Sequence, residues 1–180
     1  MLFFAQKVLH SDLDEAGRAF PERITGFLII KETGKIYGFR VSEARCILRV
    51  NIKNFTERKT VIFPGAIIET GKDPSASVLQ KEGIEIIGSK TETASGEFLG
   101  EVSDFSFDPL DGQIVKYYVK TGLLQNIWQG QLIIDKDQVV AIAKGRIIVR
   151  DNVLPEKADF KIWQKKRALL PTATAAAAEG

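Results

Sequence analysis

Residues 96–114 of this 180-residue chain, GEFLGEVSDFSFDPLDGQI, decide its fold. Phe105 and Phe107 alternate with polar residues, as they do on a strand that buries one face. Asp111 and Gly112 then mark a tight hairpin turn, because glycine adopts a positive φ without steric cost and aspartate tolerates it. The stretch therefore predicts two antiparallel strands joined at Gly112.

The same pattern occurs earlier in the chain, where residues 7–43 align with residues 86–122. A spacing of 78 pairs Phe27 with Phe105, Ile29 with Phe107, Gly34 with Gly112, Ile36 with Ile114, Phe39 with Tyr117 and Val41 with Val119. Residues 61–73 also resemble residues 132–145, at a spacing near 72. A period of this length is too long for a solenoid and indicates a duplicated unit of about 75 residues.

Each copy consists of short runs rich in β-branched and aromatic residues, which predict strands. The runs are residues 24–30, 35–41, 60–68, 100–107, 113–119, 130–135 and 145–151, whereas residues 44–60 are expected to insert a charged strand or loop. Residues 75–83 predict one or two helical turns at the junction between the two copies. Residues 155–170 form the best helix candidate, since Pro155 opens them and Pro171 closes them.

We therefore expect a mainly all-β protein of two small β-barrels in tandem, followed by a C-terminal helix and a disordered low-complexity tail. The barrels would span residues 1–78 and 79–154, and the helix and tail residues 155–180. A small sheet exposes its edge strands unless it closes or packs on a neighbour. Two barrels packed on each other would hide their edge strands and bury more apolar surface.

The opening stretch resembles the PRC-barrel family, whose domains carry a G-x-x-x-G-x-V-x-D pattern, an apolar-Asp turn and a hydrophobic strand. The matching positions are Gly96, Gly100, Val102, Asp104, Asp108 and Gly112. The likeness covers residues 84–150. The first copy departs from the pattern, with Pro21 at the position of Gly100 and Gly26 at that of Asp104.

The resemblance implies a binding module. The family includes the cytoplasmic domain of the photosynthetic reaction centre H subunit and the C-terminal domain of a ribosome maturation factor, and neither barrel is catalytic. The resemblance thus implies a non-enzymatic adaptor without a cofactor that docks onto a larger protein assembly, including one at a membrane or a photosynthetic complex. The single cysteine and the lack of a signal-peptide pattern predict a cytoplasmic location, with peripheral membrane attachment left open. Exposed barrel edges are also compatible with a homodimer.

The C-terminal segment is the first candidate for binding, because a basic helix with tryptophan can lie on an anionic membrane or dock in a groove. The candidate interaction residues are Trp128, Phe160, Lys161, Trp163, Lys165, Lys166 and Arg167. In the alternative, Phe160 and Trp163 pack back on the second barrel while the lysines stay solvated. Trp128 could equally cap the barrel core.

A basic stretch in the first copy is the second candidate, suited to RNA phosphates or an acidic protein. It contains Arg40, Arg45, Arg49, Lys53, Arg58 and Lys59, with Phe55 interleaved. The alternative is a solvated strand face. An RNA- or ribosome-associated function is the less favoured hypothesis, because 25 basic and 23 acidic residues leave a net charge of only +2, too balanced for a whole surface that binds nucleic acid.

The residue inventory narrows the chemistry. Cys46 is the only cysteine, so an internal disulfide or a zinc-binding cysteine cluster is excluded. His10 is the only histidine, and no nucleophile or acid pattern surrounds it. Asp104, Asp108 and Asp111 could bind a cation, but their spacing is not that of a calcium loop, and carboxylates that accept backbone N–H groups in a turn are the favoured interpretation. No stretch approaches the length of a membrane-spanning helix.

Overall fold

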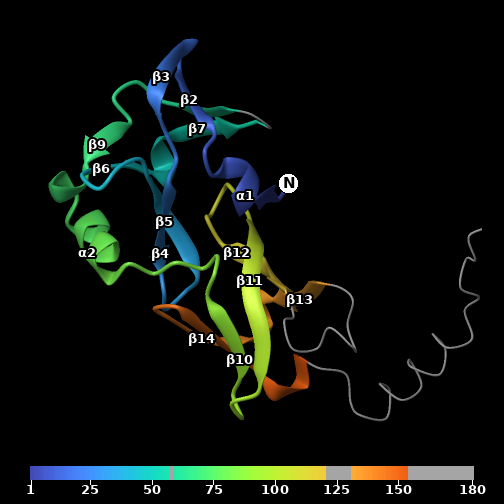
Figure 1. Cartoon of the computed structure of the whole chain (residues 1–180). Helices are drawn as coiled ribbons and strands as arrows, with labels where there is room; N and C mark the ends of the chain where they lie inside the picture. The colour runs from blue at the N-terminus through green and yellow to red at the C-terminus, as the bar shows by residue number, and fades with distance from the viewer. Residues whose placement is uncertain (57–58, 121–130, 154–180) are drawn as a thin grey trace, which may run out of the picture.

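The structure is a computed structural model that describes residues 1–56, 59–120 and 131–153 (Figure 1). In the first half the elements are β1 (Phe3–Phe4), α1 (Ala5–Val8), β2 (Asp12–Glu15), β3 (Arg18–Arg23), β4 (Gly26–Ile30), β5 (Lys35–Arg40), β6 (Arg45–Leu48), the 3-10 turn η1 (Arg49–Asn51), β7 (Ile52–Phe55), β8 (Lys59–Ile62), β9 (Ile67–Glu69), η2 (Thr70–Lys72) and α2 (Pro74–Glu82). In the second half they are β10 (Lys90–Thr93), β11 (Phe98–Phe107), β12 (Ile114–Lys120), β13 (Gln131–Asp135), η3 (Lys136–Gln138), β14 (Val139–Ala143), β15 (Arg146–Val149) and η4 (Asp151–Val153).

The described strands form three sheets. Two belong to the first half, in the orders β3-β2-β8-β7 and β4-β5-β6-β9, and one to the second half, in the order β13-β12-β11-β10-β15-β14 with β1 on β11. The mainly β prediction is therefore confirmed. Within residues 1–56, 59–120 and 131–153, none of these sheets closes into a barrel.

Strand pairing follows the same order in both halves. β2 pairs antiparallel with β3 and parallel with β8, as β10 does with β11 and β15. β5 lies between β4 and β6, as β12 lies between β11 and β13. Even the bulges recur, since Lys53 in β7 and Val140 in β14 are each the extra residue opposite a regular partner strand. The two halves thus share one set of pairings.

These pairings correct three expectations. Residues 44–60 are no insertion, because β6, η1 and β7 occupy the places that β13, η3 and β14 take in the second half. The alignment of residues 61–73 with residues 132–145 is wrong, since β8 pairs with β2 and β7 whereas β13 pairs with β12. The strand expected over residues 60–68 is two strands, β8 and β9, separated by a turn in which Ala66 N–H donates to the Phe63 carbonyl at 3.1 Å.

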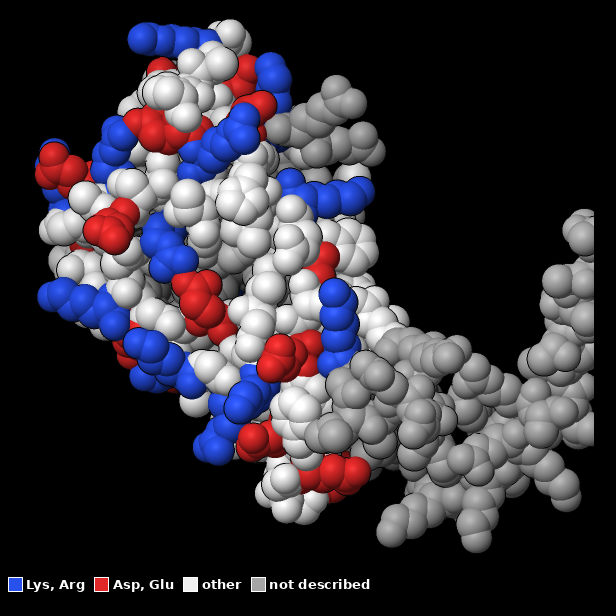
Figure 2. Space-filling model, viewed as in Figure 1, with Lys and Arg blue, Asp and Glu red and all other residues white. Residues whose placement is uncertain are grey.

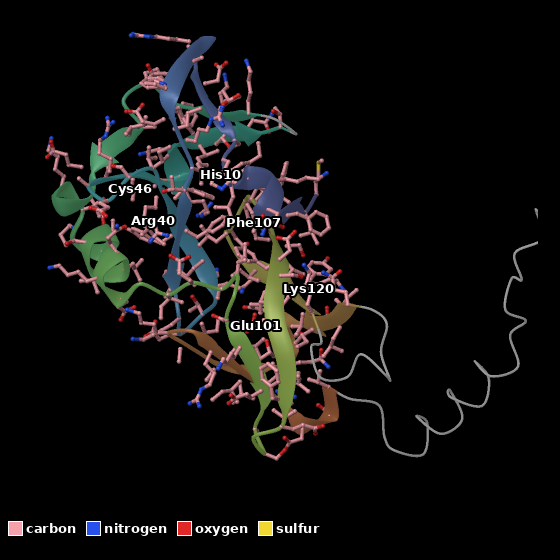
Figure 3. All side chains as sticks on the ribbon, viewed as in Figure 1. His10, Arg40, Cys46, Glu101, Phe107 and Lys120 are labelled. Carbon is pink, nitrogen blue, oxygen red and sulfur yellow. The ribbon has the colours of Figure 1, made fainter. Side chains whose placement is uncertain are left out.

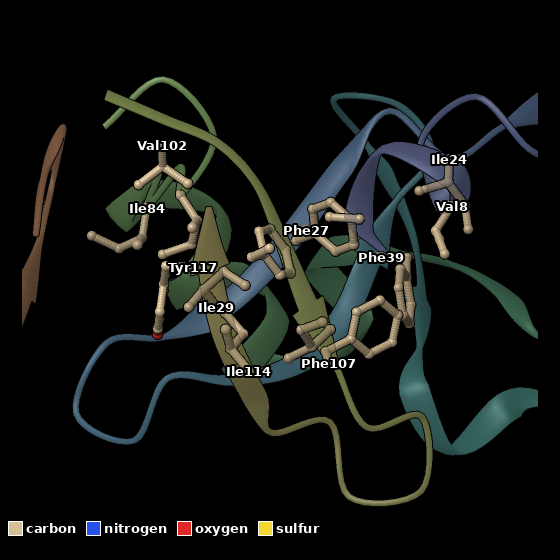
Figure 4. Packing of buried hydrophobic residues seen from close by; sticks show 14 of the residues in the cluster. Val8, Ile24, Phe27, Ile29, Phe39, Ile84, Val102, Phe107, Ile114 and Tyr117 are labelled. Atoms are coloured by element: carbon tan, nitrogen blue, oxygen red, sulfur yellow. The ribbon is translucent and has the colours of Figure 1, made fainter. Parts of the chain in front are cut away.

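One buried core spans both halves (Figure 4). Phe27 and Phe39 of the first half approach Phe107 of the second, each with ring centroids 6.3 Å apart. Phe55 contacts the same ring at 5.7 Å. The side chains of one half therefore complete the core of the other, and the boundary expected between residues 78 and 79 lies inside α2.

The tips of the two hairpins are hydrogen-bonded to each other. Ile36 N–H donates to the Gly112 carbonyl at 2.8 Å, and Ile114 N–H donates to the Gly34 carbonyl at 3.2 Å. Both glycines have positive φ, 65° and 74°, as the predicted turns require. A Cβ at Gly112 would lie 2.5 Å from the Ile36 carbonyl oxygen, so the close approach also depends on glycine.

The helix α2 covers the outside of the sheet β4-β5-β6-β9, at the left of Figure 1. It begins where the Asp73 carboxylate accepts the Ala76 N–H at 2.7 Å, and it ends at Gly83, whose φ of 60° stops a helix. The one or two turns predicted over residues 75–83 are thus confirmed. Its Ala76 packs on Leu28 and Cys46, and the three form a separate buried cluster.

Candidate functional site

An exposed apolar row crosses the outer face of the second half, the side of β1, β11, β12 and β13 that points away from the core. Because Tyr117 and Ile134 point inward and are buried, their neighbours point outward. Tyr118 is the cross-strand partner of Ile133, and its ring lies 5.5 Å from that of Phe4. Ile133 is 50% exposed and Phe4 38%. Phe4, Tyr118 and Ile133 are named the apolar row below.

The corresponding position in the first half is covered. Cys46 pairs with Arg40 across β5 and β6 as Ile133 pairs with Tyr118 across β12 and β13. Cys46 is fully buried, because α2 lies over it. In the described part of the second half, no helix takes that place over Ile133. The same position in the two halves is therefore buried in one and open in the other.

Polar groups surround the apolar row. Lys116 forms an ion pair with Asp135 at 3.0 Å, and the Asp104 carboxylate accepts the Gln6 N–H at 3.1 Å. Ser106 is buried on this side of β11, and its hydroxyl has no hydrogen-bond partner among the described residues. An apolar strip with a polar rim is typical of a protein-docking surface.

The C-terminal candidates and the loop tryptophan cannot be placed against this surface, because they lie outside the described residues. They are Trp128, Phe160, Lys161, Trp163, Lys165, Lys166 and Arg167. Arg58 of the basic stretch also lies outside them. The interaction role of these residues remains a prediction.

The structure spreads the described part of the basic stretch over two sheets, from β5 to β8. Arg40 pairs with Glu85 at 2.5 Å and Lys59 with Asp14 at 3.3 Å (Figure 3 labels Arg40). Arg45 pairs with Glu22, Arg49 donates to the Leu110 carbonyl, and Lys53 is exposed. On the face shown in Figure 2, basic and acidic side chains are interspersed. These contacts therefore do not favour a continuous cationic surface for RNA.

The Lys59–Asp14 pair is anchored by backbone as well as charge. The Gly17 N–H donates to the Asp14 carboxylate at 2.7 Å. This hydrogen bond and the Lys59 ammonium hold the pKa of Asp14 below its ordinary value. Lys59 is thus paired with a carboxylate that stays ionised, so its ammonium group is less available to bind a phosphate group.

The surroundings of Cys46 and His10 do not favour a catalytic role for either residue. Cys46 is buried, and burial raises the pKa of its thiol, so the nucleophilic thiolate is disfavoured. His10 is exposed on the turn before β2, with a φ of 64° and its own N–H bonded to the Ile24 carbonyl at 2.8 Å. The two side chains come from different elements (Figure 3).

The three aspartates considered for a cation act on the backbone instead. Asp104 accepts the Phe105 N–H, Asp108 the Leu110 N–H and Asp111 the Gln113 N–H, each at 2.8 Å. Among the residues that the structure describes, no group of three or more His, Cys, Asp or Glu side chains could hold a metal ion.

A cleft that sequence reasoning missed lies between the tip of the β4–β5 hairpin and β14, with a volume of about 240 Å³. Burial raises the pKa of Tyr117, which lines it. The charged lining residues are Lys31, Glu32, Lys136 and Asp137. These charges balance and select no ligand class. A sequence signal for the cleft is the alignment of Gly34 with Gly112, because it predicts equivalent surroundings for the two hairpin tips. Arg49 lies beside the tip at Gly112, whereas the cleft lies beside the tip at Gly34.

Neither a protein-family model nor any curated protein matches this sequence. Within residues 1–56, 59–120 and 131–153, the helices are too short or too polar to cross a lipid bilayer.

Proposed function

We propose that this protein is a non-enzymatic adaptor, built from two PRC-like β units of one duplicated sequence, that docks onto a larger protein assembly. The duplication is supported by the recurring strand pairings and by the matching bulges at Lys53 and Val140. It is also supported by two equivalent hydrogen bonds: Thr25 Oγ1 to the Arg40 carbonyl at 3.2 Å and Ser103 Oγ to the Tyr118 carbonyl at 3.0 Å.

The exposure of Ile133 is the observation that carries the docking proposal. A fully buried isoleucine side chain stabilises a protein by about 1.5–3 kcal/mol relative to an exposed one. In the first half the side chain at the equivalent position, Cys46, is buried under α2, whereas Ile133 in the second half is 50% exposed. A partner that lays an apolar segment over Ile133 and Tyr118 would gain this stabilisation, while the Lys116–Asp135 pair would fix the partner's orientation.

Sedimentation of the native protein tests this function. Wild-type chain, Ile133→Asp and the matched control Val140→Asp are expressed at natural level, and each lysate is fractionated on a density gradient. Val140 lies on β14 and is 59% exposed, so its variant adds the same charge elsewhere. We expect wild type and Val140→Asp to migrate with a large complex and Ile133→Asp to remain at the top. Equal migration of all three folded proteins would contradict the docking role of the apolar row.

The fraction that holds the complex also decides the kind of assembly. Migration with membranes would favour a complex at a membrane surface, including a photosynthetic one. Migration with the small ribosomal subunit, lost steeply as salt rises, would replace the adaptor proposal by the RNA-associated one.

A further inference from the structure

We propose that residues 155–170 of this chain lie on the outer face of its own second half, over the apolar row, in the place that α2 takes in the first half. The inference rests on the proposed docking surface and names the segment that occupies it before a partner binds.

Chain order is the first argument. α2 follows β8, and the counterpart of β8 is β15, because the two strands pair in parallel with β2 and β10 in the same register. α2 ends at Glu82, 20 residues after β8 ends at Ile62. The same distance after Val149 reaches Leu169. Residues 161–169, KIWQKKRAL, therefore stand in the sequence where a counterpart of α2 belongs.

The missing cover is the second argument. In the first half, α2 buries Cys46 and Leu28 with Ala76 and is joined by Leu79. In the second half, Ile133 is left 50% exposed at the position of Cys46. The C-terminal segment supplies the apolar side chains that such a cover needs, namely Phe160, Ile162, Trp163, Leu169 and Leu170.

Charge adds a third argument. The outer face carries Glu101, Asp104 and Asp135 against Lys116 and Lys120, and all five side chains are at least partly exposed (Figure 3 labels Glu101 and Lys120). Residues 155–170 carry five basic side chains against two acidic ones: Lys157, Lys161, Lys165, Lys166 and Arg167 against Glu156 and Asp159. A basic segment with apolar side chains matches a face whose rim has a surplus of carboxylates.

Tethering favours this segment over any separate molecule. The described chain ends at Val153. Seven extended residues, 154–160, span up to about 23 Å, comparable with the radius of a domain of this size. Attachment converts docking into an intramolecular event, at an effective concentration on the order of millimolar.

Thiol accessibility tests the proposal on the full chain. Cys46 is the only cysteine and is fully buried, so a cysteine introduced at Ile133 is the single accessible thiol of the folded protein. Ile133→Cys and the control Val140→Cys are reacted with a maleimide. We expect Ile133→Cys to react about tenfold more slowly than Val140→Cys, a ratio equivalent to 1.4 kcal/mol of protection. Adding Trp163→Asp should bring the two rates within about twofold.

Three outcomes overturn the proposal. The first is that Ile133→Cys reacts as fast as Val140→Cys. The second is that its slow reaction is unchanged by Trp163→Asp. The third is that protection rises with protein concentration, because a second copy would then be the cover. As a second readout on the folded protein, Ile133→Cys combined with Trp163→Cys should form an intrachain disulfide under mild oxidation.

The two proposals fail separately. If Ile133→Cys reacts rapidly but Ile133→Asp still loses the complex on the gradient, the adaptor stands and the self-docking segment does not. If the segment protects Ile133 and yet Ile133→Asp sediments like wild type, the segment is a permanent part of the fold and the docking function is wrong.

Discussion

Phe27 and Phe105, which occupy equivalent positions 78 residues apart, meet edge to face with ring centroids 5.0 Å apart and planes at 65°. Residues at equivalent positions contact each other only close to a two-fold axis, as in an isologous dimer interface. Lys35 and Gln113, another such pair, form an antiparallel bridge. The two halves therefore pack as a pseudo-symmetric pair whose axis passes through the core.

Truncation of either ring should unfold both halves together. Phe27→Ala and Phe105→Ala are each expected to lower the free energy of unfolding by about 3–5 kcal/mol, as buried phenylalanines do. Because the rings touch, the double variant should lose less than the sum. Urea titration followed by circular dichroism and by hydrogen exchange in each half measures this. Val50→Ala, at a site 67% exposed, is the control. Separate transitions for the two halves would contradict a shared core.

Gly112 and Gly145 offer a matched comparison of strain and steric contact. Both have φ above 70°, but a Cβ at Gly145 meets nothing within 4 Å, whereas one at Gly112 lies 2.5 Å from the Ile36 carbonyl oxygen. Gly145→Ala should cost only the left-handed penalty of about 1–2 kcal/mol. Gly112→Ala should cost clearly more, and Gly112→Val more again, since a β-branched residue resists a positive φ. Equal midpoints of thermal unfolding for the two alanine variants would show that the hairpin tips do not need this approach.

Substitution of Asp73, the N-cap residue of α2, should lower the stability of the protein. Asp73 accepts the Ala76 N–H at 2.7 Å and the Tyr37 hydroxyl at 3.2 Å. Asp73→Ala removes both hydrogen bonds and should destabilise the protein by about 1–2 kcal/mol. Asp73→Asn keeps the cap and should cost less than half as much. Hydrogen exchange of α2 amides locates the loss; an unchanged exchange rate in Asp73→Ala would contradict the capping role.

Tyr117 makes stability depend on alkaline pH. Burial raises its pKa, so the native state keeps the phenolic proton at a pH where the unfolded chain loses it, near 10. Unfolding then releases a proton, and the free energy of unfolding falls as pH rises above about 10, by up to about 1.4 kcal/mol per pH unit. Tyr117→Phe should remove this loss, and Phe39 at the equivalent position indicates that phenylalanine fits.

The measurement for Tyr117 is chemical denaturation between about pH 8 and pH 11. It is made in a Cys46→Ala background, because burial raises the pKa of that thiol too and its ionisation on unfolding adds a loss of the same sign. If wild-type and Tyr117→Phe stabilities run parallel over the whole range, the phenol is not protected in the native state.

Local patterns predicted most of the second half. The alternation at Phe105 and Phe107 gave the correct strand, and the glycine at position 112 gave the correct turn, because both depend only on side-chain parity and backbone sterics. The interpretation of residues 44–60 failed, since β6 and β7 are short and carry charges on their solvent side. β6 pairs with β5 and β9, and β7 pairs with β8, and only these pairings identify them as the counterparts of β13 and β14.

The candidate site was harder to foresee. Ile133 was expected only as part of a strand, because exposure depends on whether another segment covers the strand. Cys46 illustrates the same limit, because the helix that buries it lies 28 residues or more further along the chain. The salt bridges of Arg40 and Lys59 reach partners 45 residues away. These two side chains therefore belong to a basic stretch in the sequence but are paired with acidic side chains in the structure.

The reciprocal hydrogen bonds between Ile36 and Gly112 and between Ile114 and Gly34 do not depend on the peptide link between the halves. A polypeptide that carried one half alone would present the same hairpin tip to its twin and could rebuild both bonds in a true homodimer. The linker then serves mainly to supply local concentration and to let the two tips diverge independently. Because both bonds join backbone groups at the hairpin tips, two separately expressed halves would keep every group that forms them.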